Sequence, residues 1–158
     1  MNTYIDFDNM NIKQIKNWLI NIREKYYFEL KKASELPNAF WETYSSFCNT
    51  AGGYIILGVE EKRPFNEITG VGNSDKALLS LWDQLSNPNK VSFRNVDNQD
   101  VHAYNIDGKD VIIVYVKEVP DSMKPVYIGG KLENTWRRTG DGDRKATKEE
   151  LAIFMRNA

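Results

Sequence analysis

The sequence contains one cysteine, Cys48, and one histidine, His102, among its 158 residues. A lone cysteine excludes an internal disulfide and any metal site made of cysteines, and His102 has no second histidine or cysteine to help it bind a metal. Patterns typical of a Ser-His-Asp triad, a nucleotide-binding P-loop or a Rossmann fingerprint are also missing. We therefore interpret Cys48 as a small core residue on a helix, and we assign His102 a structural or surface role.

The sequence has neither an excess of one charge nor a long apolar run. The 21 Lys and Arg residues oppose 22 Asp and Glu residues. This balance argues against indiscriminate coating of nucleic acid but permits a local basic patch. No apolar run approaches the roughly 20 residues that span a bilayer, and the N-terminal segment lacks the basic lead and apolar core of a signal peptide. We expect a cytoplasmic protein without a membrane partner.

The length and composition are those of one globular domain. With 41% hydrophobic and 27% charged residues, a chain of this length buries roughly two thirds of the surface that it exposes when unfolded. We expect one domain over residues 1–158. Its last helix reaches the chain end without a stop signal, which is also compatible with the N-terminal part of a longer protein.

The stretch Phe47–Glu61, FCNTAGGYIILGVEE, carries the strongest structural signal. Gly52 and Gly53 end a helix, and the residues that follow, Tyr54–Val59, form an unbroken apolar run. A strand of this kind is usually covered on both faces, so we expect it at the centre of a sheet. The polar residues directly after it lie where open sheets often place their sites.

Hydrophobic periodicity predicts the remaining elements. Apolar residues at helical spacing predict helices over residues 11–22, 39–49, 74–85 and from 148 onward. Alternating or fully apolar runs predict strands over residues 26–32, 54–59, 90–94, 101–106 and 111–116, with further candidates at 126–128 and 135–138. Asn11, Ser74 and Thr147 are expected as helix caps, and Asp107-Gly108 as a hairpin turn. The predicted fold is α+β, with helices packed on a mixed sheet.

Basic residues crowd the glycine-containing stretch TWRRTGDGDRKATK near the C-terminus. They are Arg137, Arg138, Arg144, Lys145 and Lys148. Arginines beside a glycine-rich loop that leads into a helix suit phosphate binding, and Trp136 offers a ring on which a base can stack. Further candidates to extend this surface are Lys31, Lys32, Lys62, Arg63 and Arg94. The alternative is a solvated loop with internal salt bridges.

Four segments resemble the Schlafen AlbA-type domain. They read EKYYFELKKA, FCNTAGGYIILGVEE, KPVYIGG and WRRTGDGDRKATKEEL. The most specific elements are Glu29-Leu30-Lys31, the run Cys48-Asn49-Thr50-Ala51-Gly52-Gly53 and the Arg-x-Gly element near the C-terminus. The resemblance spans about Ile15 to Phe154. It implies the Schlafen AlbA-like fold and a DNA-binding domain of a bacterial transcriptional-regulator-like protein.

The resemblance also implies an alternative activity. Some animal members of the family cleave transfer and ribosomal RNA with a metal-dependent trio of acids. Glu24 and Glu29 have the separation of two of those acids, and the third position falls at Glu60 or Glu61, where nuclease members usually carry aspartate. Magnesium or manganese would bind Glu24, Glu29 and one of these, because hard cations prefer oxygen ligands. In the simpler alternative, the glutamates are solvated or paired with lysines and need no cofactor.

These observations lead to three hypotheses. The first is binding of nucleic acid, either DNA or RNA, through the C-terminal arginine loop of a recognition or regulatory module. The second is a metal-dependent ribonuclease that uses the acidic residues. The third is a protein-interaction or dimerisation module, such as a homodimer, in which the basic loop is incidental.

Overall fold

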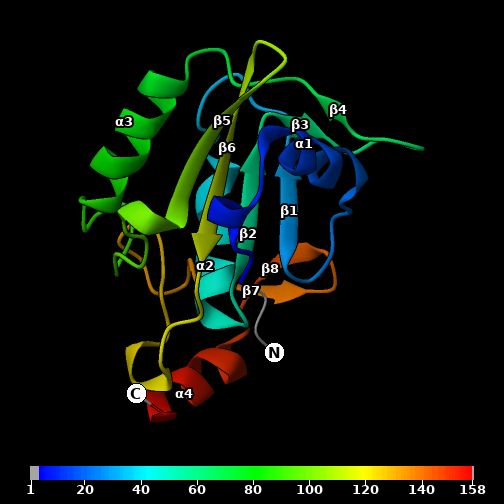
Figure 1. The fold of residues 1–158 in the computed structure, drawn as a ribbon. Coiled ribbons are helices and arrows are strands. Elements are labelled where there is room, and N and C mark those ends of the chain that lie inside the picture. Colours follow the sequence, from blue (N-terminus) through cyan, green and yellow to red (C-terminus); the bar gives the residue numbers. More distant parts are fainter. Residues whose placement is uncertain (1–3, 158) are drawn as a thin grey trace.

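A mixed four-stranded sheet forms the centre of the computed structural model, which describes residues 4–157. The strands lie in the order β1-β2-β6-β5 (Figure 1). Their bounds are Phe28–Lys31 for β1, Gly53–Leu57 for β2, Val101–Ile106 for β5 and Lys109–Val116 for β6. Strands β1 and β2 are parallel, whereas β6 is antiparallel to both of its neighbours. The predicted α+β fold with a mixed sheet is confirmed.

Strand β2 lies between β1 and β6 and is buried along its whole length. Ile56 pairs with Leu30 of β1 on one side and with Ile113 of β6 on the other. Because side chains alternate along a strand, Ile56 faces one hydrophobic core and Ile55 faces the other. The unbroken apolar run therefore reflects cover on both faces of the sheet, as predicted.

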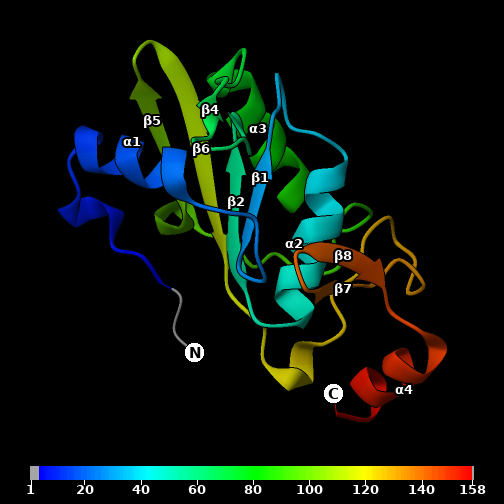
Figure 2. The ribbon, with the colours of Figure 1, turned by 90° about the vertical axis from the view of Figure 1, so that its right-hand side faces the viewer.

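Helices cover both faces of the sheet (Figures 1 and 2). Helices α2 (Ala39–Asn49) and α3 (Ser74–Leu85) pack on one face, and α1 (Ile12–Asn21) packs on the other. Helix α4 (Lys148–Asn157) lies away from the sheet, at the lower end of these views, and none of its residues is buried. Within the described residues, no helix combines the length and the apolar character needed to cross a bilayer.

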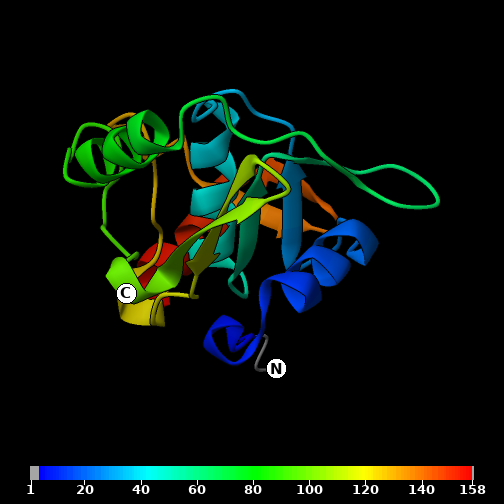
Figure 3. The same cartoon turned by 45° about the horizontal axis from the view of Figure 1, so that its top comes forward.

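Short elements complete the fold. Strands β3 (Val59–Glu60) and β4 (Glu67–Ile68) form a small hairpin whose loop projects from the body of the protein (Figure 3). Strands β7 (Trp136–Thr139) and β8 (Gly142–Lys145) form a second hairpin. Single turns of 3-10 helix lie at Phe7–Asn9, Asn98–Asp100 and Asp121–Met123.

The helix caps follow the local sequence signals in two of three cases. The expected caps at Asn11 and Thr147 are confirmed, since each side chain accepts a backbone N–H from the first turn of its helix. The cap of α3 is Asn73 rather than the expected Ser74. The Ser74 hydroxyl donates instead to Asp110 at 3.0 Å, a partner distant in sequence that a local pattern does not reveal.

Some of the predicted strands need correction. The segments 90–94 and 126–128 meet in an isolated bridge rather than a ladder. One reason is that the Phe93 carbonyl accepts a hydrogen bond from the Tyr44 hydroxyl at 2.6 Å, so this backbone group is not free to pair in a sheet. Conversely, residues 142–145 were expected to be part of a loop and instead form β8.

Candidate functional site

The β7–β8 hairpin carries most of the predicted basic residues and is anchored on helix α2. Asn49 Nδ2 donates to the carbonyls of Val126 at 2.9 Å and Trp136 at 3.0 Å, and Asn49 Oδ1 accepts the Val126 N–H at 2.7 Å. Ser45 Oγ accepts the Trp136 N–H at 3.0 Å. Both polar side chains are buried, where an unmade hydrogen bond is costly. These bonds therefore fix the position of the hairpin on α2.

Arg138, which the sequence predicted to contact nucleic acid, is buried inside the protein. Its side chain has 0% exposure, and Nη1 donates to Glu29 Oε1 at 2.8 Å and to Asp143 Oδ1 at 3.0 Å. Nη2 donates to the carbonyls of Lys25 at 2.8 Å and Phe28 at 3.0 Å. A guanidinium without exposure and with this many partners does not reach a phosphate. The prediction for Arg138 is therefore corrected: the residue joins the hairpin to β1.

Glu150 offsets the charge of the two other arginines of the hairpin. Its carboxylate is ion-paired with Arg137 and lies 3.4 Å from Arg144 Nη1. The hydrogen bond from the Thr147 N–H and those from the two arginines lower the pKa of Glu150 to about 2, so this side chain is ionised at neutral pH. Arg144 keeps 49% of its side chain exposed, against 35% for Arg137.

Lys145 and Lys148 are exposed cations, and neither forms a salt bridge with another residue in the range 4–157. Lys145 Nζ lies 5.9 Å from the centre of the Trp136 ring. That ring is partly buried, and its Nε1 has no hydrogen-bond partner among the described residues. Lys145 thus lies over one face of the ring on which a base was expected to stack. The hairpin therefore presents Lys145, with Arg144, to solvent in preference to the tryptophan.

The other predicted cations lie away from the hairpin. Lys62 and Arg63 are exposed in the β3–β4 loop, where Lys62 Nζ lies 2.6 Å from Glu67. Lys31 has only 14% of its side chain exposed and lies 3.6 Å from Glu29. Lys32 and Arg94 are also exposed but lie on neither the hairpin nor this loop. The predicted cations therefore do not form one continuous surface, and Lys31 adds little exposed area.

Glu24, Glu29 and Glu61 meet at the edge of β1. Glu61 Oε2 accepts the Glu24 N–H at 2.6 Å. Burial, together with the negative charges of Glu29 and Glu61, raises the pKa of Glu24 to about 7. Glu60 lies instead 3.7 Å from Lys32. Of the two positions considered for a third acid, the structure brings Glu61, not Glu60, to the other glutamates.

This acidic cluster does not fit a magnesium or manganese ion as it is arranged. Glu29 is ion-paired with Arg138 at 2.8 Å and lies 3.6 Å from Lys31, so its charge is already balanced. No group of three or more His, Cys, Asp or Glu side chains within residues 4–157 is placed to hold a metal ion. The geometry therefore supports no metal-dependent step.

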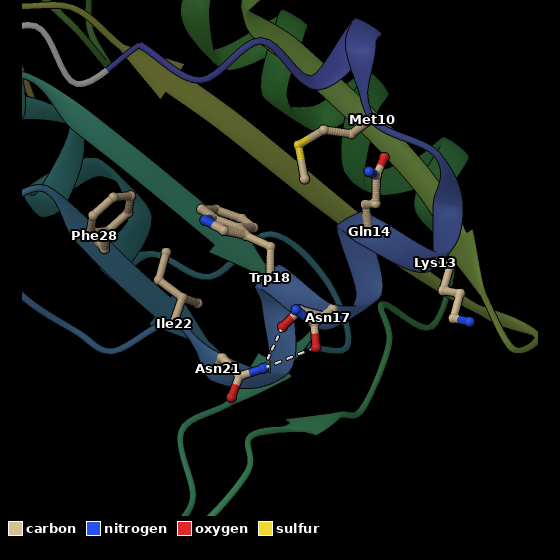
Figure 4. Close-up of a pocket in the computed structure, with 8 residues that line it drawn as sticks. All are labelled: Met10, Lys13, Gln14, Asn17, Trp18, Asn21, Ile22 and Phe28. Atoms are coloured by element: carbon tan, nitrogen blue, oxygen red, sulfur yellow. Dashed lines mark hydrogen bonds between the residues drawn. The ribbon is translucent and has the colours of Figure 1, made fainter.

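A groove of about 790 Å³ lies along helix α1, and none of the predicted site residues lines it (Figure 4). Its apolar lining comes from Met10, Trp18, Ile22 and Phe28, and polar side chains of α1 complete it. Trp18 and Ile22 belong to the apolar stripe of α1. Such a stripe does not distinguish buried residues from residues that line a groove, which is why the sequence did not reveal this feature.

The chain belongs to the Schlafen, AlbA_2 family, whose family model matches residues 24–147. The matched region begins at the first glutamate of the acidic cluster. It includes β1, β2 and the whole β7–β8 hairpin, and therefore both partners of the buried Glu29–Arg138 pair. No curated protein matches the sequence.

Solved structures share this fold. One is the NMR structure of the N-terminal domain of an ATP-dependent DNA helicase RecG-related protein from Nitrosomonas europaea. It has a TM-score of 0.56 and 23% identity, and the match covers 86% of this chain and 90% of that one. Another is the crystal structure of the DIP2311 protein from Corynebacterium diphtheriae, with a TM-score of 0.55 and 18% identity. That match covers 92% of this chain but only 28% of the DIP2311 chain.

Proposed function

We propose that this chain binds nucleic acid through three cations, Arg144, Lys145 and Lys148, at the end of the β7–β8 hairpin and the start of α4, which we call the basic face. The observation that carries the proposal is that Lys145 and Lys148 are exposed cations without a salt-bridge partner in residues 4–157. They follow a hairpin held in place by buried hydrogen bonds. Because the backbone is already fixed, binding requires less additional ordering of the chain and therefore a smaller loss of conformational entropy.

The comparisons support the same class of ligand. The chain is a member of the Schlafen, AlbA_2 family. The Nitrosomonas europaea domain of similar fold belongs to a protein named as related to an ATP-dependent DNA helicase. We extend the association with nucleic acid to this chain as part of the proposal, and we place it in the cytoplasm.

The basic face is small, which limits the expected binding mode. Three cations contact few phosphates, and Glu150 offsets part of the charge of Arg144. The logarithm of the binding constant should therefore fall with the logarithm of salt concentration with a slope of only about −2 to −3. Since phosphate contacts carry no sequence information, the basic face by itself should bind DNA and RNA alike.

Fluorescence anisotropy with labelled single-stranded DNA, single-stranded RNA and duplex DNA, measured over a range of salt concentrations, tests the proposal. We expect the double variant Lys145→Ala, Lys148→Ala to bind about ten-fold more weakly at low salt and to lose about 2 from the magnitude of the salt slope. The control Lys76→Ala, Lys109→Ala removes two exposed lysines elsewhere and should bind as the wild type does. Equal binding by the two double variants, or no binding by the wild type, would refute the proposal.

A metal-dependent ribonuclease is a second hypothesis to test, since Glu24, Glu29 and Glu61 lie together, although within residues 4–157 they are not placed to hold an ion. The ion pair between Glu29 and Arg138 would have to break before Glu29 could bind a metal. The test is to incubate the protein with structured RNA and manganese. Cleavage that stops on addition of a chelator, and that is absent from Glu24→Gln, would establish the nuclease. Glu24→Gln is the preferred variant, since Glu29→Gln would also disturb the buried Arg138.

A further inference from the structure

The β3–β4 loop, residues 61–66, is held rigidly although it projects from the sheet (Figures 1 and 3). The Arg23 guanidinium donates to the carbonyls of Lys62 at 2.5 Å and Pro64 at 2.6 Å, and to Asn66 Oδ1 at 2.9 Å. Asn66 is buried, and its Nδ2 donates to the carbonyls of Leu19 at 2.9 Å and Ile22 at 2.6 Å. The loop is therefore braced by the end of α1 and by the two residues that follow it, Ile22 and Arg23.

This brace holds a large apolar side chain in solvent. Phe65, in the second half of the loop, has 58% exposure. A mobile loop would be free to fold an exposed phenylalanine against the body, since burial of the ring is favourable. Here the hydrogen bonds of Arg23 and Asn66 fix the backbone on either side of Phe65 and so keep the ring outside. A ring kept exposed in this way suits a partner that covers it.

Two cations precede this ring in the loop. Arg63 is exposed and forms no salt bridge with any residue of the described range 4–157, whereas Lys62 is exposed and paired with Glu67 and Glu60. An exposed aromatic ring together with an unpaired cation is typical of surfaces that bind single strands, where bases stack and phosphates pair with the charges. An anionic membrane is disfavoured, because lipid-binding segments typically gather 4–8 basic residues and this loop has two.

We propose that the β3–β4 loop is a stacking finger for an unpaired base, in which Phe65 stacks on the base while Arg63 contacts a neighbouring phosphate. This inference rests on the proposed function and specifies its ligand as single-stranded nucleic acid, or a strand with an unpaired base. The bases of a duplex stack on each other and leave no face for Phe65 except at an end. Every base has a π-face, so the finger binds without sequence preference.

The experiment compares the wild type with Phe65→Ala, Phe65→Trp and the control Leu79→Ala, which truncates a side chain of similar exposure on α3. Each protein is titrated with two probes: a single strand of about 12 nucleotides, and a blunt-ended duplex that contains the same sequence. We expect Phe65→Ala to weaken single-strand binding by about ten-fold or more and to leave duplex binding unchanged. Phe65→Trp should bind at least as well as the wild type. Thermal unfolding checks that each variant is folded.

A single strand that contains 2-aminopurine gives a direct readout of stacking. Its fluorescence should fall when the wild type binds and should change little with Phe65→Ala at saturating protein concentration.

Three outcomes would overturn the stacking finger. Absence of this quenching, or equal single-strand affinities for Phe65→Ala and wild type, would overturn the finger but leave the proposed binding through the basic face intact. Failure of the wild type to bind either probe overturns the proposed function itself. Tighter wild-type binding to anionic vesicles than to the single strand, lost in Phe65→Ala, assigns the loop to a membrane and also overturns the finger.

Discussion

Arg138 of β7 donates a 2.8 Å hydrogen bond to the carboxylate of Glu29 in β1, a residue 109 positions earlier in the chain. The pair lies where the C-terminal hairpin meets the edge of the sheet, and the Arg138 guanidinium also lies 5.0 Å from the centre of the Phe47 ring. Two residues that the sequence assigned to separate functions, catalysis and nucleic-acid binding, thus neutralise each other inside the protein. The pair makes the hairpin part of the packed structure.

Replacing Arg138 by lysine should destabilise the protein strongly. Lysine keeps the positive charge, but its ammonium does not reproduce the planar fork that donates to two carboxylates and to backbone carbonyls. Disrupting a buried charge network of this kind costs about 3–5 kcal/mol. Urea denaturation measures the loss. The matched control is Arg144→Lys at an exposed position, which should change stability by less than about 0.5 kcal/mol. Similar midpoints for the two variants would contradict the structural role of Arg138.

Asn49→Ala should also destabilise the protein. The substitution removes three hydrogen bonds to the backbone of Val126 and Trp136. The Val126 carbonyl keeps its hydrogen bond from Ser45 Oγ at 2.7 Å, so two backbone groups lose their Asn49 partner. Each buried group left without a partner costs about 1–3 kcal/mol, so we expect a loss of at least about 2 kcal/mol in the free energy of unfolding. Asn17→Ala on the exposed surface of α1 is the control. If the two variants unfold at the same urea concentration, Asn49 does not anchor the hairpin.

Glu24 should make the protein less stable as the pH rises from about 4.5 to about 7. Its pKa is raised from 4.5 to about 7 in the folded state, so between these values the folded protein binds more protons than the unfolded chain. Stability therefore falls with rising pH in this window. The full shift corresponds to about 3 kcal/mol, and the loss should be smaller because Glu24 is only half-buried and solvent screens its charge. Glu24→Gln should flatten the slope and be more stable than the wild type at pH 8. Denaturation at several pH values measures both quantities.

Glu150 is the internal comparison for this experiment. Its folded-state pKa is lowered to about 2, so it stabilises the fold above pH 4.5, and this contribution is lost as the pH falls toward 2. Its effect therefore lies below the window of Glu24. A wild-type stability that is flat between pH 4.5 and 7, or an unchanged slope in Glu24→Gln, would contradict the raised pKa of Glu24.

Cys48 should be unreactive in the folded protein. It is fully buried, and burial raises the pKa of its thiol to about 12, so the reactive thiolate is scarce and inaccessible. Ellman's reagent should therefore modify Cys48 only as fast as the protein opens, and fully in denaturant. Rapid stoichiometric modification without denaturant would contradict the buried position.

The strands of the central sheet and most helix ends were predictable because their causes are local. The apolar run from Tyr54 onward indicated a doubly covered strand, and Asp107-Gly108 adopts the positive φ values, 53° and 84°, that a tight hairpin turn requires. The caps at Asn11 and Thr147 follow from side chains that reach their own first helical turn. Each of these signals lies within a few residues of the structure that it predicts.

The sequence alone determined the sheet, the helices, the family and a C-terminal stretch rich in cations. The tertiary structure decided what those cations do. It buried Arg138 against Glu29 and left Lys145 and Lys148 exposed; it brought Glu61, rather than Glu60, to Glu24. The physical reason is that burial and ion pairing depend on which distant segments pack together. A charged side chain has the same local pattern whether it lies in solvent or beside a buried carboxylate from another strand.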